Sequence, residues 1–364
     1  MNGKYRLAVL ACLALLVLVL RLGTLLHPYP PFSDSESQQY ISAIRNVSKG
    51  LPAGFGERYG SFYITTIPYG LIGRYVGLYS TIFIVKGLFL FLAVLLVYSF
   101  AEHLNKGKWT SLLAVALFAV MPTAVLSQNF ANYTGGFFVA ILSLLSLWLF
   151  LHYYENRKVA FLLCGMLSSY VASLMWNGGM IVFVSLFWCC FMLFLKKWLS
   201  WRSLILFGTI LSFGAYFIIY PHLSINVGPD LSNVNVISAS QIPMFNFLTF
   251  ISQQNLSLRN SVAMDGAIIT GFFMFMLPIL LLFFWDITDA SPWLIGLCAF
   301  LLVAMVVGLV NARFESFVIL PASILAAYGT KYIRISWKLP IYLSLIGFMA
   351  ILAMYEVWPF FNYF

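Results

Sequence analysis

The sequence predicts an all-α polytopic membrane protein. Hydrophobic residues make up 62% of the 364 residues and charged residues only 9%. The mean hydropathy is +0.94, and a soluble fold needs far more polar surface than this to cover its core. Apolar runs long enough to cross a bilayer recur from one end of the chain to the other. The net charge is +9, and the cationic residues lie mostly between these apolar runs. This distribution indicates membrane topology and argues against nucleic-acid binding.

Charged and Pro/Gly-rich segments divide the chain into about eleven predicted spans, each near the length that a bilayer core requires. The expected ranges are 7–26, 79–102, 109–127, 135–153, 159–176, 180–195, 203–221, 267–285, 292–311, 316–330 and 339–357. Segment 61–77 contains Pro68, Gly70, Gly73 and Arg74, so it is expected to be an interfacial helix. The whole of 1–364 is expected to be one membrane domain, with no soluble domain at the C-terminus.

The distribution of Lys and Arg predicts the orientation. Twelve of the 20 cations fall in one set of alternate short loops, at positions 4, 6, 106, 108, 157, 158, 196, 197, 202, 331, 334 and 338. Six lie in the other set, at positions 45, 49, 58, 74, 259 and 313. The richer set is expected to be cytoplasmic. The N-terminus is then cytoplasmic and the C-terminus external, across the inner membrane if the cell is bacterial, and both long polar loops, 27–78 and 222–266, face outward.

Polar loops on one face allow three classes of protein: an enzyme acting on lipid-linked substrates at the outer leaflet, a transporter, or a non-catalytic assembly partner. Transporters usually carry ionisable groups at mid-membrane and broken helices in repeated halves. Here the cations inside spans are Arg21, toward the outer end of its helix, and Lys86, about eight residues into its own. No internal repeat is evident, so the transporter is the weakest of the three.

Five segments occur in an order that resembles a known family. They are SDSESQQYISAIRNVSKGL after the first span, MPTAVLSQNFANYTGGFFVAILSLLSLWLF, SSYVASLMWNGGMIVF, VISASQIPMFNFLTF in the second outer loop, and NARFESFVILPASILAAYG. In this order they resemble the catalytic membrane subunit of oligosaccharyltransferases, including the single-subunit bacterial and archaeal enzymes, within the GT-C glycosyltransferase superfamily. The resemblance implies a GT-C-like helical bundle that acts on lipid-linked saccharides.

The first outer loop holds the predicted catalytic acid. The resemblance places Asp34 at the position of the family's essential acid. Independently, the order Ser33-Asp34-Ser35-Glu36 after a proline-rich segment is typical of a capped helix start, where backbone donors and the helix dipole hold a carboxylate. A purely structural helix cap explains the same residues.

The family's metal ligands have no acidic counterparts here. Asn132-Tyr133-Thr134 stands where the family has an Asp-x-Asp pair, and Gln241 stands where it has a glutamate in the second outer loop. Magnesium and manganese favour carboxylates, so no metal or other cofactor is expected. The side chains of Asn132, Thr134 and Gln241 are expected to contact substrate instead.

Arg313 matches the family arginine that contacts the lipid-linked phosphate, and a guanidinium suits a phosphate through paired donors. The alternative is an interfacial arginine paired with Glu315. Glu36, Arg58 and Arg74 are further candidates for contacts with donor or acceptor.

Together these residues predict a metal-independent glycosyltransferase that uses a polyprenyl-phosphate-linked saccharide as donor. Ligation or polymerisation of lipid-linked saccharides, as in surface-polysaccharide assembly, fits the same chemistry. The family's soluble domain with its Trp-Trp-Asp-Tyr-Gly motif has no counterpart in this sequence. Two alternatives therefore stay open: a non-catalytic relative that binds lipid-linked saccharide or a partner subunit, and a true oligosaccharyltransferase whose acceptor-binding domain comes from a partner subunit.

Overall fold

The computed structural model describes residues 3–21, 42, 44–51, 69–105, 109–120, 134–175, 272–285, 291–310, 315–334 and 336–361. Within these ranges the regular structure is entirely helical. The helices are α1 (Gly3–Leu20), α5 (Leu78–Leu104), α6 (Thr110–Val120), α8 (Thr134–Asn156), α9 (Val159–Met175), α14 (Leu277–Trp285), α15 (Pro292–Val310), α16 (Glu315–Gly329) and α17 (Lys338–Phe361). A π-helical turn, Phe272–Met276, precedes α14, and a 3-10 turn, Thr330–Tyr332, follows α16.

The described helices coincide with predicted spans to within a few residues at most of their ends. The expected spans 180–195 and 203–221 lie outside the described residues, as do 22–26 and 121–127, so the number of spans stays a prediction. Two helical stretches, Phe83–Leu104 and Phe137–Asn156, are long and apolar enough to cross a membrane. The all-helical structure and these two stretches fit the membrane protein that the composition predicts.

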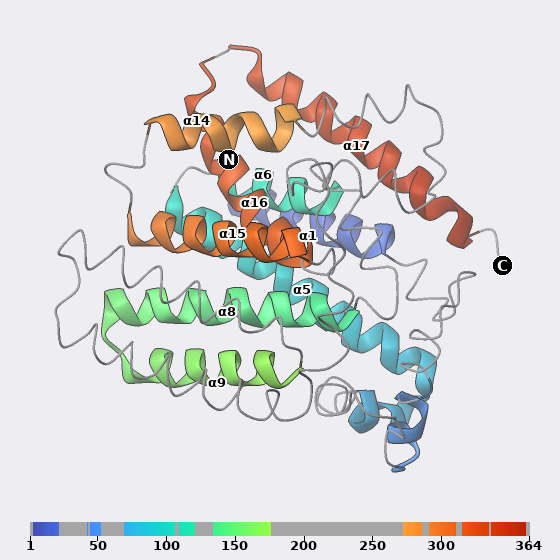
Figure 1. Cartoon of the computed structure of the whole chain (residues 1–364). Helices are drawn as coiled ribbons and strands as arrows, with labels where there is room; N and C mark the ends of the chain where they lie inside the picture. Colours follow the sequence, from blue (N-terminus) through green and yellow to red (C-terminus); the bar gives the residue numbers. More distant parts are fainter. Residues whose placement is uncertain are drawn as a thin grey trace.

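Helix α16 lies at the centre of the bundle (Figure 1), where it contacts α5, α6, α8, α14 and α15. Its sequence is apolar on all sides, which is typical of a helix with no solvent-facing surface. Phe317, Ile319, Ile324 and Leu325 are completely buried. The hydroxyl of Ser323 donates to the carbonyl of Ile319 at 2.8 Å, so this buried polar group finds its partner within its own helix.

Polar contacts join three helix termini at one end of the bundle. Arg6 Nη2 of α1 donates to Glu102 Oε1 near the end of α5 at 2.8 Å and to the hydroxyl of Ser111 at the start of α6 at 3.1 Å. The guanidinium also lies 5.1 Å from the ring centroid of Tyr98. We call this the Arg6 end of the bundle and the opposite end, where α1 finishes at Arg21, the Arg21 end.

Helices α8 and α9 form a close antiparallel pair (Figure 1). The Ser146 hydroxyl of α8 donates to the carbonyl of Gly165 in α9 at 2.9 Å, and the Ser168 hydroxyl of α9 donates to the carbonyl of Leu142 at 2.8 Å. A side chain at Gly165 would meet the Phe150 ring at 3.3 Å. Small residues that allow close approach and interhelical hydrogen bonds are typical of contacts between membrane helices.

The chain ahead of α5 turns sharply. Residues 69–76 form a short helix, and Gly77 follows with a φ of 82°, a conformation that favours glycine. The described helical residues 69–76 belong to the expected interfacial helix 61–77. Residues 61–68 lie outside the description, so the length and the interfacial position of this helix stay predictions.

Two helical glycines provide a test of this packing. A Cβ at Gly329 of α16 would lie 2.1 Å from the carbonyl oxygen of Pro278 in α14, whereas a Cβ at Gly347 of α17 would have no neighbour within 4 Å. Gly329→Ala should lower the free energy of unfolding by about 1–3 kcal/mol because backbone atoms must move. Gly347→Ala should leave it unchanged or raise it by up to about 1 kcal/mol. Thermal unfolding in detergent, followed by circular dichroism, measures both; equal effects would contradict this packing of α16 against α14.

Candidate functional site

Most of the residues predicted for the site lie outside the described part of the chain. These are Asp34, Glu36, Arg58, Asn132, Gln241 and Arg313. The structure describes the backbone of Thr134, which is the first residue of α8. Of the predicted site residues, Arg74 alone has a described side chain. The expected grouping of these residues therefore remains a prediction.

Arg74 lies on the short helix 69–76, and its side chain is exposed. Its Nη2 atom lies 3.3 Å from the position that a Cβ of Gly50 would occupy, and Gly50 has a φ of 76°. The guanidinium thus lies against the turn that ends the helical residues 44–48. An exposed guanidinium on a short helix can bind an anion at a membrane surface.

Ring contacts fix the register of α5 against α8. The rings of His103 and His152 lie 5.3 Å apart, and the rings of Phe89 and Phe138 stack with centroids 3.9 Å apart. Phe89 precedes His103 by the same fourteen residues as Phe138 precedes His152. The two helices therefore run parallel, and each position of α5 lies opposite the position of α8 numbered 49 higher.

Lys86 is a buried cation on α5. Its side chain is 7% exposed, and it makes no hydrogen bond or ion pair within the described part of the chain. It lies one helical turn before Phe89, so the register places it opposite Gly135, directly after Thr134 at the start of α8. Lys86 thus lies level with the beginning of the helix that follows Asn132-Tyr133-Thr134.

Arg21 is the second buried cation, 1% exposed. Its guanidinium donates to the carbonyls of Val17 at 3.1 Å and of Ala119 and Phe118 at 3.4 Å, and it lies 5.1 Å from the Phe118 ring centroid. The Arg21 guanidinium therefore joins α1 to α6.

The two buried cations lie at similar depth. Fifteen residues of α1 separate Arg21 from Arg6, and sixteen residues of α5 separate Lys86 from Glu102. At a rise of 1.5 Å per residue, Arg21 lies about 22 Å along α1 from Arg6, and Lys86 lies about 24 Å along α5 from Glu102. Arg6 and Glu102 form an ion pair, so both distances start from the same level. Both positive charges are therefore near the Arg21 end of the bundle. Both residues are recognisable in the sequence as cations inside predicted spans, although no part in the site is predicted for them; the signal is an ionisable residue in an apolar helix.

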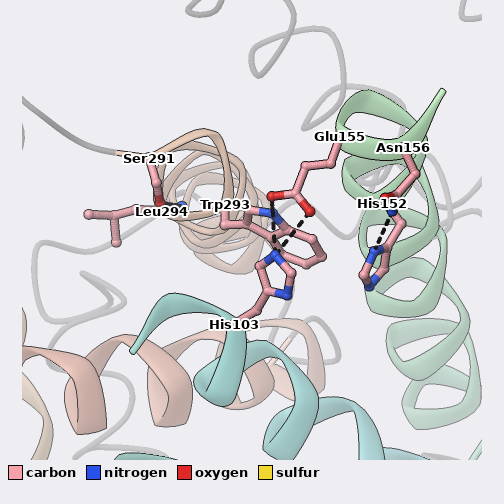
Figure 2. Close-up of polar contacts among 7 residues, drawn as sticks. All are labelled: His103, His152, Glu155, Asn156, Ser291, Trp293 and Leu294. Atoms are coloured by element: carbon pink, nitrogen blue, oxygen red, sulfur yellow. Dashed lines mark hydrogen bonds and ion pairs between the residues drawn. The ribbon is translucent and has the colours of Figure 1, made fainter. Parts of the chain in front are cut away.

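A polar cluster occupies the Arg6 end (Figure 2). The Glu155 carboxylate of α8 accepts a hydrogen bond from Trp293 Nε1 of α15 at 2.6 Å and lies 3.0 Å from His103 Nε2 of α5. The His103 ring lies 3.9 Å from the Trp293 ring, between centroids. His152 completes the cluster, with its ring 4.9 Å from that of Trp293. These contacts hold the ends of three helices together.

Within the described residues, no group of three or more His, Cys, Asp and Glu side chains is arranged to hold a metal ion. The positions compared with the family's metal ligands, Asn132 and Gln241, lie outside that part of the chain. Metal independence therefore remains a prediction from residue type.

Comparison with known proteins places the fold. The chain matches the apo crystal structure of the Archaeoglobus fulgidus oligosaccharyltransferase with a TM-score of 0.62 over 99% of its length, at 13% sequence identity. It matches the same organism's oligosaccharyltransferase AglB, in complex with an inhibitory peptide and a dolichol-phosphate, with a TM-score of 0.61 over 98% of its length, also at 13% identity. In both cases the chain spans 55% of the solved chain. No protein-family model and no curated protein matches the sequence. The chain therefore has an oligosaccharyltransferase-like fold, in agreement with the resemblance found in the sequence.

The cluster in Figure 2 predicts a structural role for Glu155. Glu155→Ala should lower the free energy of unfolding by about 1–3 kcal/mol, because it leaves the indole N–H of Trp293, which is 2% exposed, without its acceptor. Asn156→Ala is the matched control, since Asn156 is exposed and makes only a 3.4 Å contact with His152. Unfolding in detergent compares the variants; a loss no greater for Glu155→Ala than for the control would show that the cluster does not stabilise the bundle.

Proposed function

We propose that this protein is a membrane glycosyltransferase that transfers a sugar or oligosaccharide from a polyprenyl-phosphate-linked donor to an acceptor at the outer face of the membrane. The observation that carries the proposal is the oligosaccharyltransferase-like fold, which extends over 99% of the chain. One solved relative is in complex with a dolichol-phosphate, a lipid phosphate of the class proposed here. The buried cations near the Arg21 end supply positive charge suited to such a group.

In the proposed reaction, the bond between the anomeric carbon of the sugar and the phosphate oxygen breaks, and its electron pair stays on the phosphate. The acceptor oxygen forms the new bond to that carbon. Asp34 takes the proton of the acceptor hydroxyl as general base, and Arg313 binds the donor phosphate. Glu36, Arg58 and Arg74 are the further proposed contacts with donor or acceptor, together with Asn132, Thr134 and Gln241.

The proposed orientation keeps the N-terminus in the cytoplasm and the loops 27–78 and 222–266 outside, following the distribution of Lys and Arg. Glu102 and Glu155 then mark the cytoplasmic end, with Arg21 and Lys86 near the outer leaflet. The donor, the acceptor and the predicted catalytic acid thus meet on the same side as the buried cations.

Asp34→Asn tests the enzyme directly. The substitution keeps size and polarity but removes basicity, so turnover should fall by roughly two to four orders of magnitude while donor binding changes little. Complementation of a strain that lacks this gene, scored by its saccharide products, reads out the effect in cells. Gln38→Ala, four residues away in the same loop and given no part in the site, is the matched control and should retain most activity. Full activity of Asp34→Asn would favour the non-catalytic relative over the enzyme.

Chelation tests the proposed absence of a metal. Because Asn132, Thr134 and Gln241 stand where carboxylate ligands would be required, activity in membranes should survive treatment with EDTA. Addition of Mg²⁺ or Mn²⁺ after chelation is the control, and it should not raise the rate. Loss of activity on chelation that is restored by either ion would replace this mechanism with that of a metal-dependent oligosaccharyltransferase.

A further inference from the structure

We propose that the two short helices ahead of α5, residues 44–48 and 69–76, form a surface that binds the anionic headgroups of the surrounding bilayer. We call it the Arg74 surface, after the arginine that lies where the two helices meet. The inference does not depend on the proposed function, because the ligand is the lipid of the bilayer itself. The evidence is the contact between the two helices, their level along α5, and the side chains that they expose.

Direct contacts hold the two helices of the Arg74 surface together. A Cβ at Gly70 would overlap the side chain of Val47, so the helices approach closely at this point. The Arg74 Nη2 atom lies 3.3 Å from the position that a Cβ of Gly50 would occupy. Lys49 precedes Gly50 in the same turn. Arg74 and Lys49 therefore lie at the same junction of the two helices.

The level of the Arg74 surface in a membrane follows from the length of α5. The helix begins at Leu78, 24 residues before Glu102, which is about 36 Å at a rise of 1.5 Å per residue. An average helix tilt of about 20° reduces this depth to about 34 Å, which still exceeds the roughly 30 Å of a hydrocarbon core. With the ion pair of Arg6 and Glu102 at one edge of the core, the start of α5 lies among the headgroups at the other edge. Figure 1 shows both short helices beside this start, at the edge of the bundle.

One face of helix 69–76 is suited to the membrane interface. Leu71, Arg74 and Tyr75 are three and four residues apart, so they share that face. Leu71 is 63% and Tyr75 88% exposed, and Arg74 is exposed as well. Tyr69, on the other side of the helix, is completely buried. Tyrosine is enriched at the level of the headgroups. An interfacial helix places its apolar side chains at the boundary of the acyl chains and its cations beside the phosphates.

The exposed charge of the Arg74 surface is positive. Among the described residues of the two helices and of the turns that follow them, the charged side chains are Arg45, Lys49 and Arg74, and all three are exposed. A guanidinium pairs well with the oxygens of a phosphate. The headgroup of an anionic lipid therefore matches these cations, and its acyl chains match Leu71. A free anion or an acidic soluble protein matches the charge alone.

Hydrogen–deuterium exchange of the full chain tests the proposal without reference to transfer activity. The protein is compared in discs of phosphatidylcholine and in discs in which phosphatidylglycerol replaces part of that lipid. Peptides that cover 44–51 and 69–77 should exchange at least about fivefold more slowly in the anionic discs, because each exposed Lys or Arg is stabilised by anionic lipid. Sodium chloride at about 1 M should abolish the difference by screening. Peptides from the centre of α16 should exchange equally in both lipids.

Charge variants assign the effect to the Arg74 surface. The neutral pair Lys49→Gln/Arg74→Gln should lose the slower exchange in anionic discs, and Lys49→Arg/Arg74→Lys should keep it. Lys158→Gln, which removes an exposed lysine at the other end of the bundle, should also keep it. Tyr75→Ser should speed exchange by the same factor in both lipids, because it removes an interfacial side chain that carries no charge.

Equal exchange of the unaltered protein in the two lipids would overturn the proposal, and so would an effect of phosphatidylglycerol that persists in the neutral pair. The first comparison uses the unaltered protein, so it decides the matter even if a variant does not fold. Arg74 is also a proposed contact of the donor, so a short-chain polyprenyl phosphate is added to the phosphatidylcholine discs at one molecule per protein. Slower exchange with this compound and none with phosphatidylglycerol would assign the surface to the donor and reject binding of bilayer lipid.

Discussion

The absence of hydrogen-bonding partners in lipid is the constraint on which the rest of this structure depends. A polar group inside a bilayer is stabilised by a partner within the protein, and three of the described serines have one: Ser146 and Ser168 bond to carbonyls of the neighbouring helix, and Ser323 to its own. Arg21 satisfies its guanidinium with carbonyls of α1 and α6. The Ser143 hydroxyl and the Trp148 indole N–H, by contrast, are buried without a hydrogen-bond partner among the described residues.

The distribution of polar contacts gives the two ends of the bundle different properties. At the Arg6 end, Arg6 pairs with Glu102, the His103 ring lies beside the Glu155 carboxylate, and an indole donor adds a third helix. Such contacts between distant segments fix helix positions without providing a site for a ligand. At the Arg21 end, the buried charged side chains among the described residues are Arg21 and Lys86, both cations. The Arg6 end therefore joins helices through ion pairs and hydrogen bonds, and the buried charge described at the Arg21 end is positive.

Much of the fold was predictable from the sequence, because length and hydrophobicity suffice to locate membrane helices. The bounds of α5, α8, α9 and α15 agree with the predicted spans to within three residues. The sequence also names the charged residues inside spans. It could not show that Lys86 lies opposite Gly135, because that register depends on contacts such as the stacking of Phe89 on Phe138, between segments almost fifty residues apart. For the same reason Glu155 and Trp293 were not predicted to meet. The grouping of Asp34, Gln241 and Arg313 still rests on residue type and resemblance.

The change in charge during the proposed reaction explains why a fixed cation, the proposed Arg313, could serve where a metal is used elsewhere. A sugar joined to a polyprenyl monophosphate is a phosphodiester with one negative charge, and the released polyprenyl phosphate carries close to two at neutral pH. A cation beside this phosphate binds the product, and the transition state that leads to it, more tightly than the donor, which is the condition for acceleration of the step. A pyrophosphate leaving group develops a larger charge, for which a divalent ion is better suited. The neutral residues Asn132, Thr134 and Gln241, which stand where the resembling family has acids, are the sequence feature from which we infer a saccharide carried on a lipid monophosphate as donor.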